Sequence, residues 1–441
     1  MKKIQKVKSL FALILALSLL LPMGIMSTAG APAKAPAARD YTIISPYATV
    51  DWDTWDRYKA NLHTHSTVSD GKDPFVDVIE AYYARDYDIL AMAEHGVVNK
   101  GWTKVPETVP ILSFNFLLPF MKPVPLTEER NRQITTGADR GGRGMTDIMG
   151  IEMNAAVLMK NHVNGFFADY GQGYWGKEND FETVIAGMEE AGGLTHINHP
   201  GDWLGSAKDI NIAKDPKNIK FFADLLKKYP SCLGLEVLNS HDSPTRHDRV
   251  LWDGLLESVI PYGRNVFGFG NSDSHHMGEI DTSFGIFMMP ENTVANVRTA
   301  METGTFFACG RRARPELGDS FVGEGAYPVV TKIKVDNTQK TITLQGEDYD
   351  TIEWIAKGEI IATGEAINLR EHENEIGCYV RAQLKGPGGI CFTQAFIIDD
   401  GTPPEPEPEE SFIEKWINDF IFAVKSTRIY VIIAKIVDKL S

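Results

Sequence analysis

The sequence predicts an α/β protein: a distorted seven-stranded (β/α) barrel, then a small all-β sandwich and a C-terminal helix. Between residues 58 and 315, short apolar strand patterns alternate with helical patterns, which is typical of parallel βαβ units. Seven strand candidates occur there, and that number favours a closed or distorted barrel over an open sheet. From 326 to 400, strand patterns follow one another without a helix pattern, which predicts the sandwich.

The first 33 residues predict a cleaved signal peptide. Four lysines, at positions 2, 3, 6 and 8, precede an apolar run over residues 9–22, and small residues follow it. The run is short for a membrane span, which leaves an uncleaved anchor as the alternative. We therefore expect a secreted, extracellular protein, or one associated with the cell surface.

The remaining segments differ in composition. Residues 34–57 predict a linker, and the polar, proline-interrupted stretch 97–147 predicts an insertion that carries substrate contacts. Residues 401–410, rich in Pro and Glu, predict an extended spacer. Residues 411–440 predict an amphipathic helix with one apolar stripe, whose lysines and arginines argue against a transmembrane span. That helix either docks on its own protein or contacts a membrane surface or a protein partner.

Charge and cysteine content argue against two further classes of protein. The formal net charge is −15, and removal of the four signal lysines gives −15 − 4 = −19. An acidic surface repels phosphate polymers, so nucleic-acid coating is not expected, whereas small anionic substrates remain compatible with local metal charge. Four cysteines are too few for a disulfide scaffold, and we expect all four to be free. On their predicted hairpin, Cys378 and Cys391 would face Ile397 and Leu384, offset from each other.

Histidines and acids gather at the ends of the predicted strands. His63 and His65 lie at i and i+2, so both face one side of a strand end. His162 instead opens a strand. The other members end strands or follow them closely: Asp70, His95, Glu152, His199, Asp273 and His275. The C-terminal ends of barrel strands converge on one face, so these side chains are expected to meet.

The joint pattern predicts a metal centre. Imidazoles with carboxylates suit Zn, Mn or Fe, and nine groups are too many for one ion, so a bridging carboxylate would give a bi- or trinuclear cluster. Taken singly, His95 is explained as a loop histidine, Asp273 as a helix N-cap and Asp70 as a turn residue. Glu152 is harder to explain, because an acid after a buried strand is costly unless paired.

This motif set resembles the polymerase and histidinol phosphatase (PHP) superfamily over residues 58–315. The resemblance implies a PHP-type barrel with up to three divalent metal ions. The matching stretches are Asn61-Leu62-His63-Thr64-His65-Ser66, Ser69-Asp70-Gly71, Glu94-His95, Gly150-Ile151-Glu152, Asn198-His199-Pro200-Gly201 and Asn271-Ser272-Asp273-Ser274-His275.

The resemblance also implies how the ligands are shared. It places His63, His65, Glu152 and Asp273 on one ion. Glu152 would bridge to a second ion held by His162 and His199, and a third would be held by Asp70, His95 and His275. The superfamily usually has Asp where this chain has Glu94, which puts the support of His95 in doubt.

Further candidates lie outside the ligand set. His241 follows a strand in a loop, so it either touches substrate or is solvated, and we group it with Asp273 and His275 as catalytic. Arg140 and Arg143 of the insertion, together with Arg311, are candidates for a substrate phosphate, although most surface arginines do no such thing. His196 is expected to pack in the interior, because residues three apart on a strand face opposite sides.

The activity expected is hydrolysis of a small phosphorylated substrate by a secreted metal-dependent phosphoesterase. A metal-bound hydroxide would attack phosphorus, and the other ions would neutralise the developing charge. Two alternatives stay open: a metal-dependent amide hydrolase, and a non-enzymatic cell-surface protein stabilised by metal.

Overall fold

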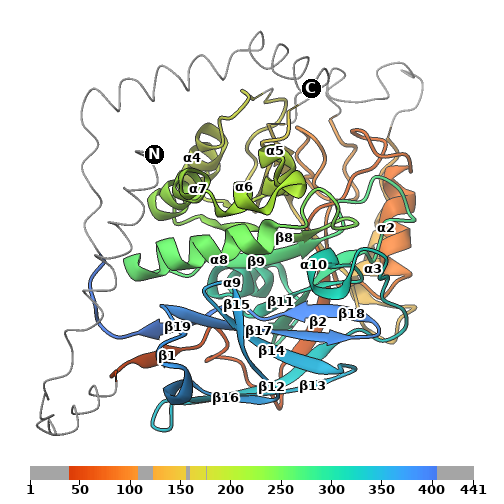
Figure 1. Ribbon diagram of the computed structural model, residues 1–441. Helices are drawn as coiled ribbons and strands as arrows, with labels where there is room; N and C mark the ends of the chain where they lie inside the picture. The colour runs from red at the N-terminus through yellow and green to blue at the C-terminus, as the bar shows by residue number, and fades with distance from the viewer. Residues whose placement is uncertain (1–38, 108–122, 155–158, 175, 405–441) are drawn as a thin grey trace, which may run out of the picture. The chain divides into compact units, whose positions relative to one another are not determined.

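The computed structural model describes residues 39–107, 123–154, 159–174 and 176–404 (Figure 1). The predicted signal peptide, the helix over 411–440 and most of the spacer lie outside the described residues. The elements below belong to one compact unit that begins at Asp40. In the part of the chain that is described, no helix combines the length and the apolar character needed to cross a membrane.

In the region that the sequence predicts as a barrel, called the barrel region below, the first sheet has five strands in the order β5-β6-β7-β8-β9. Strands β7, β8 and β9 run parallel to one another, whereas β6 is antiparallel to both β5 and β7. The α/β prediction holds, but the run of parallel strands is broken at β6. The strands are β5 (Gly150–Met153), β6 (Val163–Phe166), β7 (Leu194–Ile197), β8 (Cys232–Asn239) and β9 (Phe267–Asn271).

The second sheet has eleven strands, with the path β1-β19-β17-β18-β11-β10-β2-β3-β4 and the β14–β15 pair joined to β17. Its barrel part holds three parallel strands, β2, β3 and β4, and an antiparallel pair, β10 and β11, that the sequence patterns did not reveal. These strands are β2 (Asp56–Asn61), β3 (Ile89–Ala91), β4 (Thr146–Ile148), β10 (Ser283–Met289) and β11 (Phe306–Gly310).

Backbone hydrogen bonds link the two sheets just beyond the ends of β2, β3 and β9. The amide of Ala93 donates to Thr64 O at 3.1 Å, and the amide of Asp273 donates to His63 O at 3.0 Å. The amide of Glu152 donates to Glu94 O at 3.0 Å. The chain that leaves β2 therefore lies between the chains that leave β3 and β9, and several strand ends share one edge.

Helices cover the strands where their apolar faces allow it. Helix α7 begins at Pro216, with the Asp215 side chain accepting from the amide of Lys217, a favourable start for a helix. Its buried residues, with those of α8, pack against β8 (Figure 1). The α-helices are α2 (Phe75–Tyr83), α3 (Glu128–Thr136), α4 (Glu182–Glu190), α5 (Pro200–Leu204), α6 (Ile210–Lys214), α7 (Pro216–Lys228), α8 (Asp248–Val259), α9 (Val294–Thr303) and α10 (Arg314–Leu317).

The C-terminal strands form two layers around one core, to which Leu344, Trp354 and Phe396 contribute buried side chains. One layer is the three-stranded sheet β12-β13-β16, and the other belongs to the eleven-stranded sheet. The strands are β12 (Val329–Asp336), β13 (Thr341–Glu347), β14 (Thr351–Ala356), β15 (Glu359–Thr363), β16 (Ala366–Asn368), β17 (Tyr379–Gly386), β18 (Gly389–Phe392) and β19 (Phe396–Asp399).

The second layer is continuous with the barrel region. Strand β18 pairs with β11, with Cys391 opposite Cys309, so the sheet crosses the boundary that the sequence predicts between residues 315 and 326. A strand pattern shows which side chains are buried but not which strand is the neighbour, so this pairing was not predictable.

The described part of the predicted linker over residues 34–57 contains a strand that is paired within the fold. Strand β1 (Thr42–Ile44) pairs with β19, opposite Asp399 to Ile397. The Tyr47 hydroxyl then donates to Phe306 O at 3.0 Å and accepts from the amide of Gln394 at 2.8 Å. A strand of three residues is too short for its alternation to stand out.

All four cysteines are free thiols, as expected. Cys391 lies opposite Leu384, as the predicted hairpin requires. Ile397, however, pairs with Tyr379 and not with Cys378, because the register shifts by one residue between β18 and β19.

We predict that Arg381→Met destabilises the protein by about 3–5 kcal/mol, because it leaves a buried carboxylate without its cation. Arg381 on β17 forms two hydrogen bonds to Asp253 on α8, at 2.7 and 2.8 Å, and both side chains are buried. The free energy of unfolding in urea measures the effect. The control is Lys332→Met, which breaks an exposed pair with Asp53 and should cost under about 1 kcal/mol. Equal losses in the two variants would contradict the prediction.

Candidate metal centre

All nine side chains that the sequence analysis selects as ligands lie together at the shared strand edge. Their donor atoms fall into overlapping groups in which the atoms lie within 4.8 Å of one another. The groups are His63, Glu152 and His199; His63, His65 and Asp273; His95, Glu152 and His162; and His65, Asp70, His95 and His275.

Glu152 is at the centre of the arrangement. Its fully buried carboxylate follows Ile151 on β5 and faces nitrogens of five histidines. The Oε1 atom is 2.9 Å from His162 Nδ1, and the Oε2 atom is 2.7 Å from His95 Nδ1. The remaining histidine nitrogens, His63 Nε2, His65 Nε2 and His199 Nε2, lie 3.2, 3.3 and 3.4 Å from this carboxylate.

Asp273, which lies just beyond the end of β9, faces two of the same histidines. Its Oδ1 atom is 3.2 Å from His63 Nε2 and 3.1 Å from His65 Nε2. Asp273 and His199 both adopt positive φ, 46° and 27°, a conformation that costs free energy in residues other than glycine. Strain at two of the nine positions indicates that the surrounding structure holds these side chains in place for a purpose other than stability.

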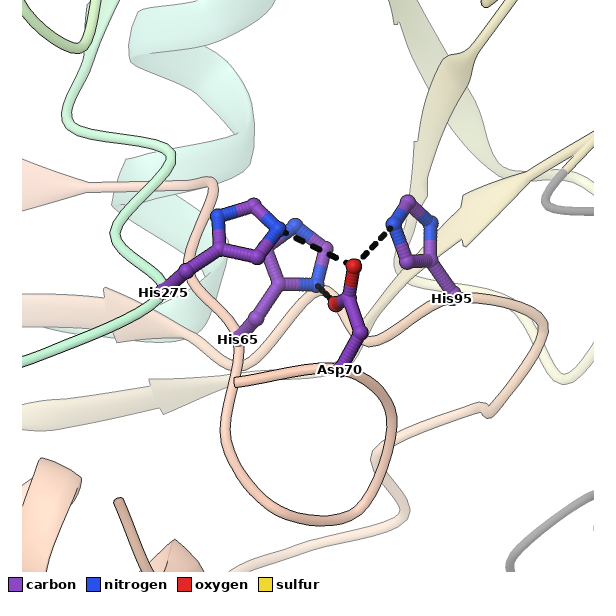
Figure 2. A group of neighbouring side chains, drawn as sticks. All are labelled: His65, Asp70, His95 and His275. Carbon is purple, nitrogen blue, oxygen red and sulfur yellow. Dashed lines mark ion pairs between the residues drawn. The ribbon is translucent and has the colours of Figure 1, made fainter. Parts of the chain in front are cut away.

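Asp70 gathers a second set of histidines (Figure 2). Its Oδ2 atom is 3.4 Å from His95 Nε2 and 3.3 Å from His275 Nε2, while Oδ1 is 3.6 Å from His65 Nδ1. The loop that carries Asp70 folds back tightly, and a Cβ atom on Gly71 would lie 2.7 Å from the backbone of His65 and Ser66. Only glycine fits at this position, which explains Gly71 in the sequence Ser69-Asp70-Gly71.

The antiparallel strand explains the place of His162. His162 precedes β6, whereas Glu152 lies near the end of β5 and the remaining ligands lie beyond the ends of their strands. Because β6 runs opposite to β5 and β7, its first residue lies at the same edge as their last ones.

Interactions among these side chains shift their pKa values. Burial opposes the charge of Glu152, yet the charges of His162, His63 and His95 hold its pKa well below the usual range. Burial likewise works against the charged forms of His199 and His275, but the neighbouring carboxylates of Glu152 and of Asp70 raise the pKa of both to about 9. The Glu152 carboxylate and the histidines around it stabilise one another's charged forms. The same groups would bind a divalent cation.

The donor atoms fit a metal in a further respect. Buried polar atoms are normally hydrogen-bonded, and several in this cluster are not. The atoms without a hydrogen-bond partner include His63 Nε2, His65 Nε2, His95 Nδ1, His162 Nδ1, Glu152 Oε2 and Asp273 Oδ1. They face one another across the cluster, and oxygen and imidazole nitrogen are suitable donors for divalent transition ions.

Glu236 is a site residue that the sequence analysis missed. Its buried carboxylate, on β8, lies 2.8 Å from His63 Nδ1 and accepts from the amide of His199 at 3.0 Å. A carboxylate on the outer nitrogen of a histidine fixes the tautomer and the ring for metal binding. The signal was present, because an acid inside the apolar strand Leu235-Glu236-Val237 needs a partner as much as Glu152 does.

Glu94 supports the loop that carries Asp70. It accepts hydrogen bonds from the Ser66 amide at 3.1 Å, from the Ser66 hydroxyl, and from the Ser69 hydroxyl at 2.5 Å. Burial raises its pKa to about 7, against the effect of these donors. The longer acid, where the superfamily usually has Asp, therefore serves the neighbouring loop.

The arginines selected for a substrate phosphate are engaged elsewhere. Arg143 donates to both oxygens of Asp88 at 2.7 Å, and Arg140 donates to Tyr87 O at 2.7 Å. Asp88 precedes β3, whereas His95 follows it, so both arginines lie at the opposite strand edge and the expectation is wrong. They compensate the charge of a buried aspartate. Arg311 donates to Gly325 O, Gly388 O and Asp281, so it too is committed.

His241 lies beside the nine ligands but is not among them. Its Nε2 atom is 3.8 Å from Glu279 Oε1, and its Nδ1 atom is buried without a hydrogen-bond partner. His196 packs in the interior as expected, with its ring stacked on Phe269 at 4.6 Å between centroids.

No protein-family model matches the chain, and no curated protein matches it either. Similar solved structures include a two-domain protein from Bacteroides vulgatus with a PHP-like metal-dependent phosphoesterase, 14% identical, covering 84% of this chain and 92% of that one, TM-score 0.41. A structure described as a metal-dependent phosphoesterase from Bifidobacterium adolescentis is 14% identical, covering 50% of this chain and 88% of that one, TM-score 0.28. An amidohydrolase from Chromobacterium violaceum is 14% identical with the same coverage, TM-score 0.29.

These three solved structures are each 14% identical to this chain, with TM-scores from 0.28 to 0.41. Their likeness to this chain is distant in sequence and in superposition. What the centre does therefore has to be argued from its own side chains.

We predict that Glu236→Gln weakens metal binding by about 10–100-fold, because a neutral amide supports the His63 imidazole less well than a carboxylate does. Competition with a chromophoric chelator measures the dissociation constant. The matched control is Glu353→Gln, which removes a buried carboxylate on β14 in the C-terminal layers. A similar loss of metal affinity in both variants, or in neither, would refute the role of Glu236.

Proposed function

We propose that this protein is a metal-dependent hydrolase of phosphate esters, of the PHP type. One observation carries the proposal: nine ligand-type side chains converge around the buried Glu152 carboxylate, and several of their donor atoms have no hydrogen-bond partner. Two or three divalent ions, Zn, Mn or Fe, suit these donors.

The arrangement favours a catalytic centre over a purely structural one. A structural metal site is closed, whereas a catalytic site keeps a face open to substrate. Glu152 and His63 are fully buried, but the His275 side chain is 33% exposed and Asp70 is 21% exposed. The cluster is thus open on the side of Asp70 and His275, which is where a substrate would enter.

The protein's part in the reaction is to bind and orient. Bound divalent ions would supply Lewis acidity and lower the pKa of water to near neutrality. Glu152 and Asp273 would hold the ions at fixed separation, and Glu236 would fix the His63 ring. His241, next to the open side, would donate a hydrogen bond to the leaving oxygen.

The placement of the protein in the cell is proposed from sequence alone. Export by the N-terminal segment, with attachment to a membrane surface or partner through residues 411–440, follows from their composition. Detection of the protein in the culture medium or the cell-surface fraction would test both points.

We predict that removal of divalent ions abolishes hydrolysis of a phosphoester panel and that adding them back restores it. Ions that bind the folded state also stabilise it, by about 4 kcal/mol at a thousandfold excess over Kd, so the melting temperature should fall on chelation. Asp273→Asn, folded as judged by circular dichroism, should lose at least about 100-fold in kcat/KM. Unchanged turnover in the chelated protein would refute the proposal, and turnover of an amide panel alone would favour an amidohydrolase.

We predict that His241→Asn lowers kcat by about 100-fold for alkyl phosphates and by much less for 4-nitrophenyl phosphate. A good leaving group departs without help from a donor, whereas an alkoxide does not. Parallel kcat measurements on the two substrates provide the comparison. Equal losses on both would assign His241 a structural role.

A further inference from the structure

A cavity of about 430 Å³ lies beside the proposed metal centre. Its walls come from the segments that follow β8, β9 and β11 and from the chain that leads to β12: His241, residues 278 and 280–282, Arg311, Arg312 and residues 322–325. Its role is not explained by the nine ligands, none of which lines it.

Glu279 connects this cavity to the metal centre. Its Oε2 atom accepts from the amide of His275 at 2.8 Å. Its Oε1 atom lies 3.3 Å from His276 Nε2 and 3.8 Å from His241 Nε2. A group seated against His241 is therefore separated from a ligand of the cluster by one side chain.

The two arginines that line the cavity, Arg311 and Arg312, differ in how they are bound. Arg311 is bound by two carbonyl groups and by Asp281, and Asp281 is also paired with Lys59. Among the described residues, by contrast, no ion pair or side-chain hydrogen bond engages the Arg312 guanidinium, which lines the cavity half-buried. Glu324 is exposed, where water screens its carboxylate.

The backbone around Arg312 is fixed in advance of any ligand. The amide of Arg311 donates to Thr282 O at 2.8 Å, and the amide of Arg314 donates to Asp242 Oδ2 at 2.6 Å. Asp242 is held in turn by Arg249, at 2.5 and 2.9 Å, in a buried pair.

The Asp242–Arg249 pair also fixes the wall of the cavity that carries His241. Ser240 and Asp242, on either side of His241, both have positive φ, 46° and 52°. Strain of this kind persists where the surroundings over-determine the backbone, as they do in binding sites. His241 and Arg312 are therefore presented at fixed positions from two loops.

We propose that this cavity is the leaving-group subsite and that Arg312 binds an anionic substituent there. The substrate class is then phosphate esters of small alcohols or phenols that carry a second oxyanion, a carboxylate or another phosphate. A guanidinium offers paired donors that match either group. The inference rests on the proposed function, since it places the scissile phosphate on the metal centre.

A binding experiment tests the subsite without catalysis. The full-length, Mn-loaded protein is titrated calorimetrically with 3-phosphonopropionate and with propylphosphonate, which lacks the carboxylate, and with 1,3-propanediphosphonate as the phosphate arm. We expect the two doubly anionic ligands to bind at least about tenfold more tightly than propylphosphonate. Arg312→Gln should abolish this preference, and Arg312→Lys should restore part of it. Arg246→Gln, which breaks a pair with Asp319 outside the cavity, should leave it unchanged.

Kinetics separate this inference from the proposed function. For phenyl phosphate and 4-carboxyphenyl phosphate, Arg312→Gln should raise the ratio of KM for the carboxylated ester to KM for the plain ester by about tenfold. A preference that is absent in the wild type, or that survives Arg312→Gln, overturns the subsite even if both esters are hydrolysed. Ligand preference that depends on Arg312 with no hydrolysis of any ester supports the subsite and refutes the phosphoesterase activity.

Discussion

The carboxylate of Glu152 imposes the strongest physical constraint in this structure. An ionised carboxylate without access to water costs several kcal/mol unless cations or strong donors surround it. Five histidines and the side-chain amide of Asn198 lie around it, the latter donating at 2.8 Å. Neutral histidines alone do not compensate a buried charge, and protonated ones repel each other. Divalent ions would resolve both problems at once, because they would supply positive charge and occupy the imidazole lone pairs.

Much of the fold serves to place donors around this carboxylate. The extensions of β2, β3 and β9 are tied by backbone hydrogen bonds, which fixes His63, His95 and Asp273 relative to one another. The residue that precedes the reversed strand β6, His162, supplies a further donor. Outside the ligands, Glu236 and Glu94 hold a ring and a loop in place. Carboxylates thus lie on both sides of the histidine rings: Glu152 lies at the centre of the cluster, and Glu236 contacts the outer nitrogen of His63.

The sequence was informative where a residue's role depends on its own strand. The apolar runs in the sequence indicate where the strands end, and the nine ligand candidates follow from those positions alone. The structure brings all nine together. What stayed hidden depends on neighbours: the direction of β6, the pairing of β18 with β11, and the commitment of Arg140 and Arg143 to Asp88. Periodicity reports which face of an element is buried, but it carries no information on what lies opposite.

The pairing of β1 with β19 bears on how the chain folds during its synthesis. Thr42 lies opposite Asp399, so the first described strand has no partner until almost the whole chain has been made. Contacts between residues so far apart in sequence form late, because a long loop must close before they are gained. Strand β1 can therefore take its place in the sheet only after residue 399 has been made. The edge of the larger sheet is thus completed by two strands from opposite ends of the described chain, and it is among the last parts of the fold that can form.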